Sequence, residues 1–162
     1  MSEVKYRVDS RLIHGQVIAR WSVKYGTQEI IIVDDLLADD DFMKDIYVMA
    51  APEDISVEVW KVDEAAEKWN ANEAAGKNIL VLFKDVAHAL RLMKSGVAID
   101  ALQIGGLPSG AGRKLVYKTI SLSDEDYTDL DEMASGGTNI FFQMLPEEEP
   151  FPYDKVKREK EK

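Results

Sequence analysis

Short apolar runs alternate with amphipathic stretches along most of this chain. The runs have the length and β-branched content of strands, and the stretches between them place apolar residues at helical spacing. Strands are therefore predicted over residues 4–8, 30–33, 56–60, 79–83, 99–104 and 140–145. Helices are predicted over residues 15–25, from Asp39–Asp41 along a face of Phe42, Ile46 and Met49, from a cap at Asp63 to Trp69, and over residues 85–93 and 124–134.

Strands that alternate with helices predict an α/β fold, with an open, mostly parallel, doubly wound sheet and helices on both faces. Ile30–Val33 and Ile79–Phe83 are apolar at every position, as in strands that are covered on both sides. Residues 70–78 are predicted to be a polar loop, and residues 115–122 an extended segment. Three tryptophans are expected to pack in or beside the core: Trp21, Trp60 and Trp69.

The chain has the length of one domain with a sizeable core, at 162 residues. Residues 1–145 are predicted to form this single α/β domain, and residues 146–162 a charged C-terminal tail. The tail begins at Pro146 and is rich in proline and charge, so we expect it to pack poorly or to form a short solvated helix.

Charge and cysteine content exclude several classes of protein. The formal net charge is −10, and an acidic surface repels nucleic acid and anionic lipid, so no nucleic-acid partner is expected. Without cysteine there are no disulfides and no thiolate metal sites. The start of the chain has no apolar signal core, and no apolar run approaches the ~20 residues of a membrane span. We therefore expect a cytoplasmic protein.

The stretch Arg7–Val17 gives the strongest chemical signal. It joins the first predicted strand to the first predicted helix, and it contains His14, two arginines, Asp9 and a glycine directly after the histidine. A neutral imidazole is a nucleophile, and a phosphoryl group on it needs N–H donors around its oxygens, which Arg11 offers as a planar fork. A helix that starts near Gly15 adds free N–H groups beside His14. The stretch therefore indicates a loop that holds phosphate on His14.

Each of these residues has a plainer explanation when it is taken alone. A single histidine at a strand end is more often a cap or a surface residue. Arg7 is as readily a strand residue that points into solvent, and Asp9 is most often a turn residue. The two arginines and the helix-starting glycine that converge on His14 favour the phosphate site.

The motif Arg-x-Asp-x-Arg-Leu-Ile-His-Gly-Gln-Val at residues 7–17, followed by Trp21, resembles the active-site segment of a known family. It is similar to the IIB components of mannose/fructose/sorbose-type sugar phosphotransferase systems. The resemblance covers most of the chain, thins beyond about residue 145, and implies a doubly wound sheet. It also implies that His14 is phosphorylated by a IIA component and passes the phosphoryl group to a sugar that enters through membrane IIC and IID components.

The resemblance implies a transferase that needs no metal and no bound cofactor, and that attaches to the inner face of the membrane through IIC and IID. Within the motif, Arg11, with Arg7 as a second candidate, is expected to balance transition-state charge. Asp9 is expected to hold Arg11 or one imidazole nitrogen. Gly15 and Gln16 are expected to supply the N–H donors of the helix start.

Further residues come to the site through the resemblance. The family carries a Gly-Gly after its fifth strand, facing the phosphohistidine, so Gly105 and Gly106 are assigned to the site. Taken by itself, the glycine-rich stretch from residue 105 to 114 is a mobile connection, because it lacks the spacing of a Walker loop or a dinucleotide fingerprint. Arg113 and Lys114 are guesses. Asp35 matches a family acidic residue near the rim, and we expect it to orient a loop or to repel a misplaced phosphate.

No metal site is predicted. The aspartates at 34–35 and 39–41 lack the alternating ligands of a calcium loop, so a solvated helix start explains them better. His88 lies in a helical pattern, far from His14 in the chain, and no His-x-x-x-His pair exists. His88 is expected to be structural or to lie on the surface.

A second function is compatible with the same residues: a non-catalytic phosphate- or anion-binding regulatory module on the same fold. Such a module would keep the loop but would not carry a phosphoryl group. The sequence leaves open which sugar is used, whether the protein forms a homo-oligomer, and which imidazole nitrogen is phosphorylated.

Overall fold

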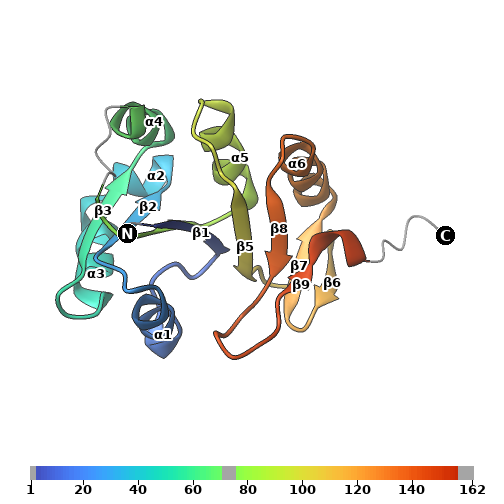
Figure 1. Cartoon of the computed structure of the whole chain (residues 1–162), viewed down its shortest axis with the longest axis horizontal. Coiled ribbons are helices and arrows are strands. Elements are labelled where there is room, and N and C mark those ends of the chain that lie inside the picture. Colours follow the sequence, from blue (N-terminus) through green and yellow to red (C-terminus); the bar gives the residue numbers. More distant parts are fainter. Residues whose placement is uncertain (1–2, 71–75, 157–162) are drawn as a thin grey trace.

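A seven-stranded sheet forms the centre of the computed structural model, which describes residues 3–70 and 76–156 (Figure 1). The strand order is β3-β2-β4-β1-β5-β8-β9, and all neighbours are parallel except β8 and β9. The strands are β1 (Val4–Asp9), β2 (Glu29–Val33), β3 (Ser56–Trp60), β4 (Ile79–Phe83), β5 (Ala101–Gly106), β8 (Asn139–Phe142) and β9 (Phe151–Pro152). The predicted open, mostly parallel sheet is confirmed.

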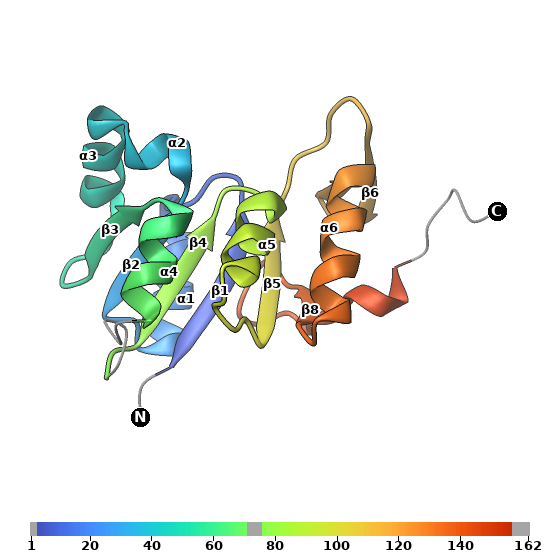
Figure 2. The ribbon, with the colours of Figure 1, turned by 90° about the horizontal axis from the view of Figure 1, so that it is seen from above.

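Helices cover both faces of this sheet (Figure 1, Figure 2). Residues of α1, α2 and α3 pack into one core, and residues of α4, α5 and α6 pack into the other, so the fold is doubly wound as predicted. Their bounds are α1 (Gly15–Tyr25), α2 (Asp35–Ala38), α3 (Asp41–Ala50), α4 (Val62–Asn70), α5 (Val86–Lys94) and α6 (Asp124–Ser135). A separate hairpin pairs β6 (Arg113–Tyr117) with β7 (Ile120–Ser123), and a 3-10 turn, η1 (Tyr153–Lys155), follows β9.

Alternate residues of the central strands enter the two cores. On β2, Ile31 and Val33 lie in the core under α4, α5 and α6, whereas Ile30 and Ile32 lie in the core under α1, α2 and α3. All four side chains are fully buried. This two-sided burial explains why the strand is apolar at every position, and apolar burial at ~25 cal/mol per Å² is the main source of stability.

The central strand β1 departs from this rule on one face. Tyr6 and Val8 enter the apolar core under α4, α5 and α6. Arg7 and Asp9 are almost completely buried as well, with exposed side-chain fractions of 1% and 0%. Because successive side chains of a strand point to opposite faces, this charged pair lies on the face that α1 covers. Charge is thus buried at the carboxyl end of the middle strand.

The acidic stretch after β2 forms two helices where one was predicted. Asp34 accepts hydrogen bonds from the backbone N–H groups of Leu36 and Leu37 and so caps a short extra helix, α2. Asp40 then caps α3 by accepting from the N–H group of Met43. Each aspartate satisfies N–H groups that a helix start leaves unpaired, so a sequence with two such caps starts two helices.

Other boundaries also differ from the predicted ones. The extended segment 115–122 is a hairpin that turns at Lys118, whose φ of 49° is left-handed. The fifth strand runs over 101–106 instead of 99–104, and α4 begins at Val62, so Asp63 lies in its first turn and is not its cap. Most of the loop predicted over residues 70–78 lies outside the described residues.

The chain beyond residue 142 does not behave as predicted. The last parallel strand ends at Phe142, three residues early. The segment after Pro146 returns to the sheet, because Phe151 pairs with Phe142 in antiparallel β9. Tyr153 is buried, packs against Tyr127 and Phe142, and bonds Asp131 through its hydroxyl at 2.7 Å. The expectation of poor packing is therefore wrong for residues 151–155, whose aromatic rings bury apolar surface.

Within residues 3–70 and 76–156, every helix is too short or too polar to cross a bilayer.

The predicted burial of the tryptophans is confirmed: Trp21 and Trp60 are buried and Trp69 is partly buried against the core.

Tyr153→Ala is expected to lower the free energy of unfolding by about 3 kcal/mol, because it removes a packed ring from the edge of the core. Tyr153→Phe keeps the ring and is expected to cost about 1 kcal/mol for the lost hydrogen bond to Asp131. Urea denaturation of both variants measures the difference. Two values below about 0.5 kcal/mol, the usual effect of a surface substitution, would show that this segment does not contribute to the fold.

Candidate active site

The loop between β1 and α1 has an unusual backbone. Leu12 and Gly15 both adopt left-handed conformations, with φ of 56° and 47°. The strained backbone of Leu12 is offset by the burial of its side chain. Leu12 is fully buried, and together with Ile13 it anchors the loop in the core under α1, α2 and α3. Ser10 N–H donates to the carbonyl of Gly106 at 2.8 Å, which ties the loop to β5. The loop is therefore fixed at both of its ends.

His14 stands at the N-cap of α1 without acting as a cap. Its backbone is extended, and its side chain makes no capping hydrogen bond. The side chain is 19% exposed, and its Nε2 atom lies 3.2 Å from Oδ2 of Asp9. Among the side chains that the structure describes, none bonds the other nitrogen, Nδ1. The imidazole is therefore oriented through one nitrogen and available through the other.

Asp9 is the centre of the site. Its carboxylate is fully buried and lies 3.2 Å from Arg7 Nη2, 3.4 Å from Arg11 Nε and 3.2 Å from His14 Nε2. The backbone N–H of Arg11 donates to the same carboxylate at 3.1 Å. The sequence left open whether Asp9 binds Arg11 or an imidazole nitrogen; in the structure it contacts both. A buried carboxylate needs such partners, because an unpaired charge away from water is costly.

Arg7 lies beneath the site. Its guanidinium donates to the Gln103 side chain, to the carbonyl of Gln143 at 3.1 Å and to the carbonyl of Met144 at 3.3 Å, as well as to Asp9. Burial lowers the pKa of Arg7 from its ordinary value, and the neighbouring Asp9 carboxylate opposes that shift. The guanidinium carbon of Arg7 lies over the ring of Trp21, 5.3 Å from the ring centroid, as in a cation–π contact. Arg7 thus holds Asp9 and does not reach the protein surface, where the sequence had made it a second candidate for phosphate.

Gly105 and Gly106 lie at the site for a steric reason. A Cβ atom on Gly105 would stand 2.0 Å from Cζ of Arg7, and one on Gly106 would stand 2.7 Å from Oδ1 of Asp9. The pairing of β1 with β5 shifts register here, so Gly105 is an extra residue in β5. Both glycines are buried, and they make room for the Arg7–Asp9 pair.

Arg11 is the cation that faces solvent. Its side chain is 54% exposed and bonds Asp9 through Nε at 3.4 Å, not through the terminal nitrogens of the fork. It borders a groove of about 540 Å³ whose other lining residues are Ser10, Gly106, Leu107, Pro108, Ser109, Thr119 and Met144. α1 begins next to it at Gly15, and the N–H groups of its first turn have no partner within the helix. Of Gln16, only the backbone position is described.

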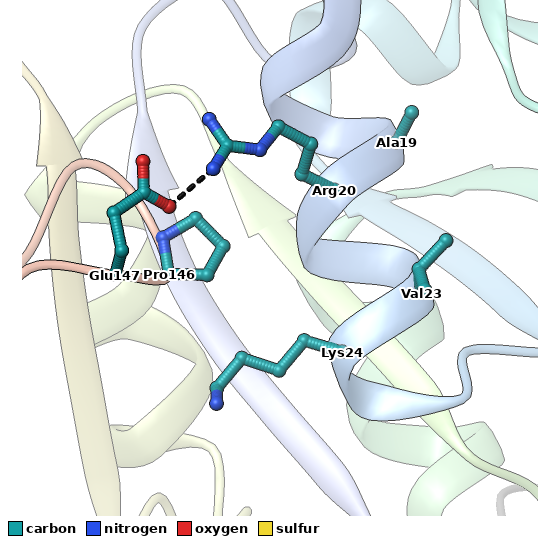
Figure 3. A pocket seen from close by; sticks show the side chains of 6 residues that line it. All are labelled: Ala19, Arg20, Val23, Lys24, Pro146 and Glu147. Atoms are coloured by element: carbon teal, nitrogen blue, oxygen red, sulfur yellow. Dashed lines mark hydrogen bonds and ion pairs between the residues drawn. The ribbon is translucent and has the colours of Figure 1, made fainter.

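The segment after β8 packs against α1 and contacts Arg7. Trp21 donates from Nε1 to the carbonyl of Met144 at 3.0 Å. Arg20, one residue earlier on α1, forms an ion pair with Glu147 across a groove of about 570 Å³ (Figure 3). Met144 therefore binds both Arg7 and Trp21 through one carbonyl. Sequence reasoning missed this segment, and it missed Gln103, whose polar side chain in an apolar strand was the available signal.

Two other residues that the sequence suggested for the site, Asp35 and Arg113, form hydrogen bonds that hold elements of the fold together. Asp35 accepts from the N–H of Val62 at 2.9 Å and from Arg91 at 2.7 Å, so it joins α2 to the start of α4 and to the last turn of α5. Arg113 bonds the carbonyl of Pro108 and the side chain of Asp126. The structure brings His14, Asp9 and Arg11 together, and it places Asp35 in contact with other elements.

His88 is structural, as one of the two predicted alternatives stated. Its Nδ1 lies 2.8 Å from Asp85, and its Nε2 accepts from the N–H of Asp35 at 3.3 Å. Ligand atoms of Asp34, Asp85 and His88 lie within 4.8 Å of one another. Asp34 and Asp85 each use one oxygen to cap a helix, so the cluster links the helix starts above β2 and β4.

Fold and site together define an α/β domain that offers one oriented imidazole, flanked by a guanidinium, at the carboxyl edge of a parallel sheet. Ligands bind at this edge in open α/β sheets. Residues 4–162 match the family described as the PTS system sorbose subfamily IIB component, and the chain belongs to that family.

Relatives in this family are sugar-specific. The chain is 31% identical over 139 residues to the sorbose-specific EIIB component of Lacticaseibacillus casei, with 86% of this chain and 85% of that protein covered. It is 29% identical over 134 residues to the mannose-specific EIIAB component of Escherichia coli K12, with 83% of this chain and 42% of that protein covered. The crystal structure of the IIBSor domain of the sorbose permease from Klebsiella pneumoniae superposes with a TM-score of 0.87 at 27% identity, over 94% of this chain and 93% of that one. The chain is therefore a IIB component of the phosphotransferase system, with a transferase role in sugar transport.

Gly105→Ala is expected to lower the free energy of unfolding by about 1–3 kcal/mol, because the new methyl group overlaps the buried Arg7 guanidinium. Gly110→Ala is the matched control, since its Cβ meets only Arg113 Cδ at 3.6 Å. Chemical denaturation of both variants measures the effect. Equal stability of the two variants would show that Arg7 moves aside at little cost.

Because of the contact between His88 and Asp85, we expect the free energy of unfolding to depend on pH. The hydrogen bond that His88 donates to Asp85 raises the pKa of His88 above 6.5, burial opposes this shift, and the carboxylates of Asp34 and Asp35 support it. A raised pKa stabilises the fold below about pH 6.5, and the gain disappears as pH rises through the raised value. Asp85→Asn keeps a helix cap but removes the charge.

The stability advantage of the wild type over Asp85→Asn should therefore be largest near pH 5–6 and fall at higher pH. We expect no more than about 1 kcal/mol, because Asp85 is partly exposed and water screens the pair. Thermal unfolding at several pH values measures this difference. A difference that grows with pH would contradict the assignment.

Proposed function

We propose that His14 is the phosphoryl carrier of this IIB component. It accepts a phosphoryl group from a phosphohistidine of a IIA partner and delivers it to a hydroxyl group of a sugar that enters through membrane IIC and IID components. One observation supports this above all. Asp9 binds Nε2 of His14 at 3.2 Å, and the half-exposed guanidinium of Arg11 lies on the same carboxylate.

The same contact favours Nδ1 as the nucleophile. An ionised carboxylate only accepts hydrogen bonds, so Nε2 of His14 carries the proton when it bonds Asp9. In a neutral imidazole the lone pair then belongs to Nδ1. Asp9 thus selects the tautomer that exposes a nucleophilic Nδ1.

The transfer consists of two displacements at phosphorus. First, the Nδ1 lone pair of His14 forms a bond to phosphorus while the N–P bond of the donor breaks and its electrons return to the donor imidazole. The phosphorylated ring keeps its proton on Nε2 and becomes cationic, and the Asp9 carboxylate stabilises that charge. In the second step a sugar oxygen attacks phosphorus, the P–Nδ1 electrons return to His14, and the hydroxyl proton passes to a base or water.

The surroundings of His14 suit the charge of the transferred group. Phosphoryl transfer depends mainly on positioning and on stabilisation of the equatorial oxygens. Donors for these oxygens are available from the half-exposed guanidinium of Arg11, which bonds the same carboxylate as His14, and from the free N–H groups at the start of α1, directly after His14. No residue role in this scheme requires a metal or a bound cofactor.

The partners follow from the family. The mannose-specific relative is an EIIAB component of which this chain covers 42%, which supports a IIA partner for a chain of the IIB type. In this proposal the protein works in the cytoplasm and reaches the inner face of the membrane through IIC and IID.

Incubation with phosphoenolpyruvate and the phosphotransferase relay tests the proposal. The intact protein should gain the mass of one phosphoryl group, His14→Ala should gain none, and NMR of the phosphorylated imidazole should place phosphorus on Nδ1. The adduct should be labile in acid and stable in base, as phosphoramidates are. No gain in mass, with phosphate binding retained, would support a non-catalytic anion-binding module instead.

Arg11→Ala is expected to slow phosphoryl transfer by about 10²–10³-fold, the usual effect of removing one preorganised donor, while the melting temperature changes little. Arg11→Lys should rescue poorly, because a point charge does not replace a two-pronged fork. Rapid-quench assays with phosphorylated IIA measure the rates. Parallel losses of activity and stability would assign Arg11 to the fold.

A further inference from the structure

The outer face of α3 presents an apolar stripe to solvent. Phe42, Ile46 and Met49 follow one another at i, i+4 and i+7, so they line one side of the helix. Their exposed fractions are 74%, 40% and 83%. The opposite side holds the helix on the core through Met43 and Tyr47, which are only partly buried. An exposed apolar patch of this kind marks an interaction surface more often than a chance arrangement.

Carboxylates surround the stripe. Residues 34–54 contain eight Asp or Glu and only one basic residue, Lys44, which gives a formal charge of −7 in a chain of −10. Asp41 and Asp45 flank Phe42 on the same helix and are exposed. Leu36 on the adjoining α2 is 83% exposed. We call six of the exposed residues of α2 and α3 the α2–α3 face: Leu36, Asp41, Phe42, Asp45, Ile46 and Met49.

The α2–α3 face lies on the same side of the molecule as the candidate active site. α2 begins directly after the carboxyl end of β2, and only β4 separates β2 from β1. Figure 2 shows α2 and α3 at the same end of the sheet as the loop that joins β1 to α1. A partner seated on this face therefore stands beside the edge that presents His14.

Charge excludes two occupants. A symmetric contact with a second copy would put the same patch against itself, and so would bring the exposed carboxylates of Asp41 and Asp45 against their own copies. Anionic lipid is repelled for the same reason. The complementary occupant is a basic protein segment that also carries apolar side chains.

Short cytoplasmic loops of membrane proteins have this chemistry. They are enriched in Lys and Arg, and apolar and aromatic residues follow where each loop enters the bilayer. We propose that the α2–α3 face docks the basic cytoplasmic loops of the membrane component that presents the sugar. The proposal rests on the proposed function, since it supplies the contact through which His14 meets its acceptor. The apolar stripe packs against the loop ends, while Asp41 and Asp45 pair with loop cations and guide the approach.

Binding to inside-out membrane vesicles that contain the IIC and IID components tests this proposal, with vesicles lacking them as the blank. The test variant is Phe42→Ser/Ile46→Ser/Met49→Ser in the full chain, and the matched control is Leu115→Ser on β6, whose side chain is 66% exposed. The triple variant should bind at least roughly tenfold more weakly than the wild type, as expected for loss of an interface centre, and the control should bind unchanged. Both should accept phosphate from IIA at the wild-type rate.

A second variant tests the same face in case the triple variant does not fold. Asp41→Lys/Asp45→Lys leaves the apolar stripe intact, and it should weaken vesicle binding and reduce its dependence on salt. His14→Ala separates docking from carrier chemistry: it should bind vesicles normally although it accepts no phosphate. A failed carrier function would appear as an unphosphorylated wild type that still binds.

Three results would overturn the docking proposal. The first is unchanged vesicle binding by folded triple and charge variants. The second is a selective loss of phosphorylation by IIA, which would make the face a IIA surface. The third is a wild-type dimer in analytical ultracentrifugation that becomes a monomer in the triple variant, which would assign the face to a second copy.

Discussion

The carboxylate of Asp9 is buried, and the candidate site is built around the need to neutralise it. Arg7 meets it from below, and Arg11 and His14 meet it from the loop. Removing a charge from water is costly unless partners of opposite charge and hydrogen-bond donors replace the solvent. The same carboxylate therefore stabilises the loop and orients the imidazole of His14, and in the proposed function it also stabilises the cationic phosphorylated ring. Structure and chemistry depend here on one group.

Distant parts of the chain are shaped to fit this buried pair. β5 contributes two glycines because any side chain at Gly105 or Gly106 would collide with Arg7 or Asp9. The segment after β8 contributes backbone carbonyls, and α1 contributes the face of Trp21. Glycine is thus needed for close packing at these two positions rather than for flexibility. A phosphate-facing role for the two glycines stays a prediction, while their steric role follows from how closely Arg7 and Asp9 approach them.

Local pattern was enough to predict the fold class. Apolar strands such as β2 and β4 show their two-sided burial directly, and the parallel order follows from the alternation with helices. Local pattern did not predict the contacts or the burial of a residue whose partners are distant in the sequence. The strand position of Arg7 says nothing about Gln103 or Met144, and an aromatic residue near the end of the chain, Tyr153, is buried only because β8 offers an edge. His14 and Arg11 were predicted to be neighbours from the motif at residues 7–17 and its resemblance to a known family, because one loop carries both; their roles in phosphoryl transfer stay predictions.

The bond between Arg7 and the carbonyl of Met144 spans 137 residues of sequence. Contacts of such long range form late, since the intervening chain must first be ordered. During synthesis Arg7 is added 137 residues before Met144, so it lacks this partner until that part of the chain has been made. A nascent or prematurely terminated chain therefore displays the histidine loop without the scaffold beneath it. The support beneath Asp9 is therefore incomplete until residue 144 has been added to the chain.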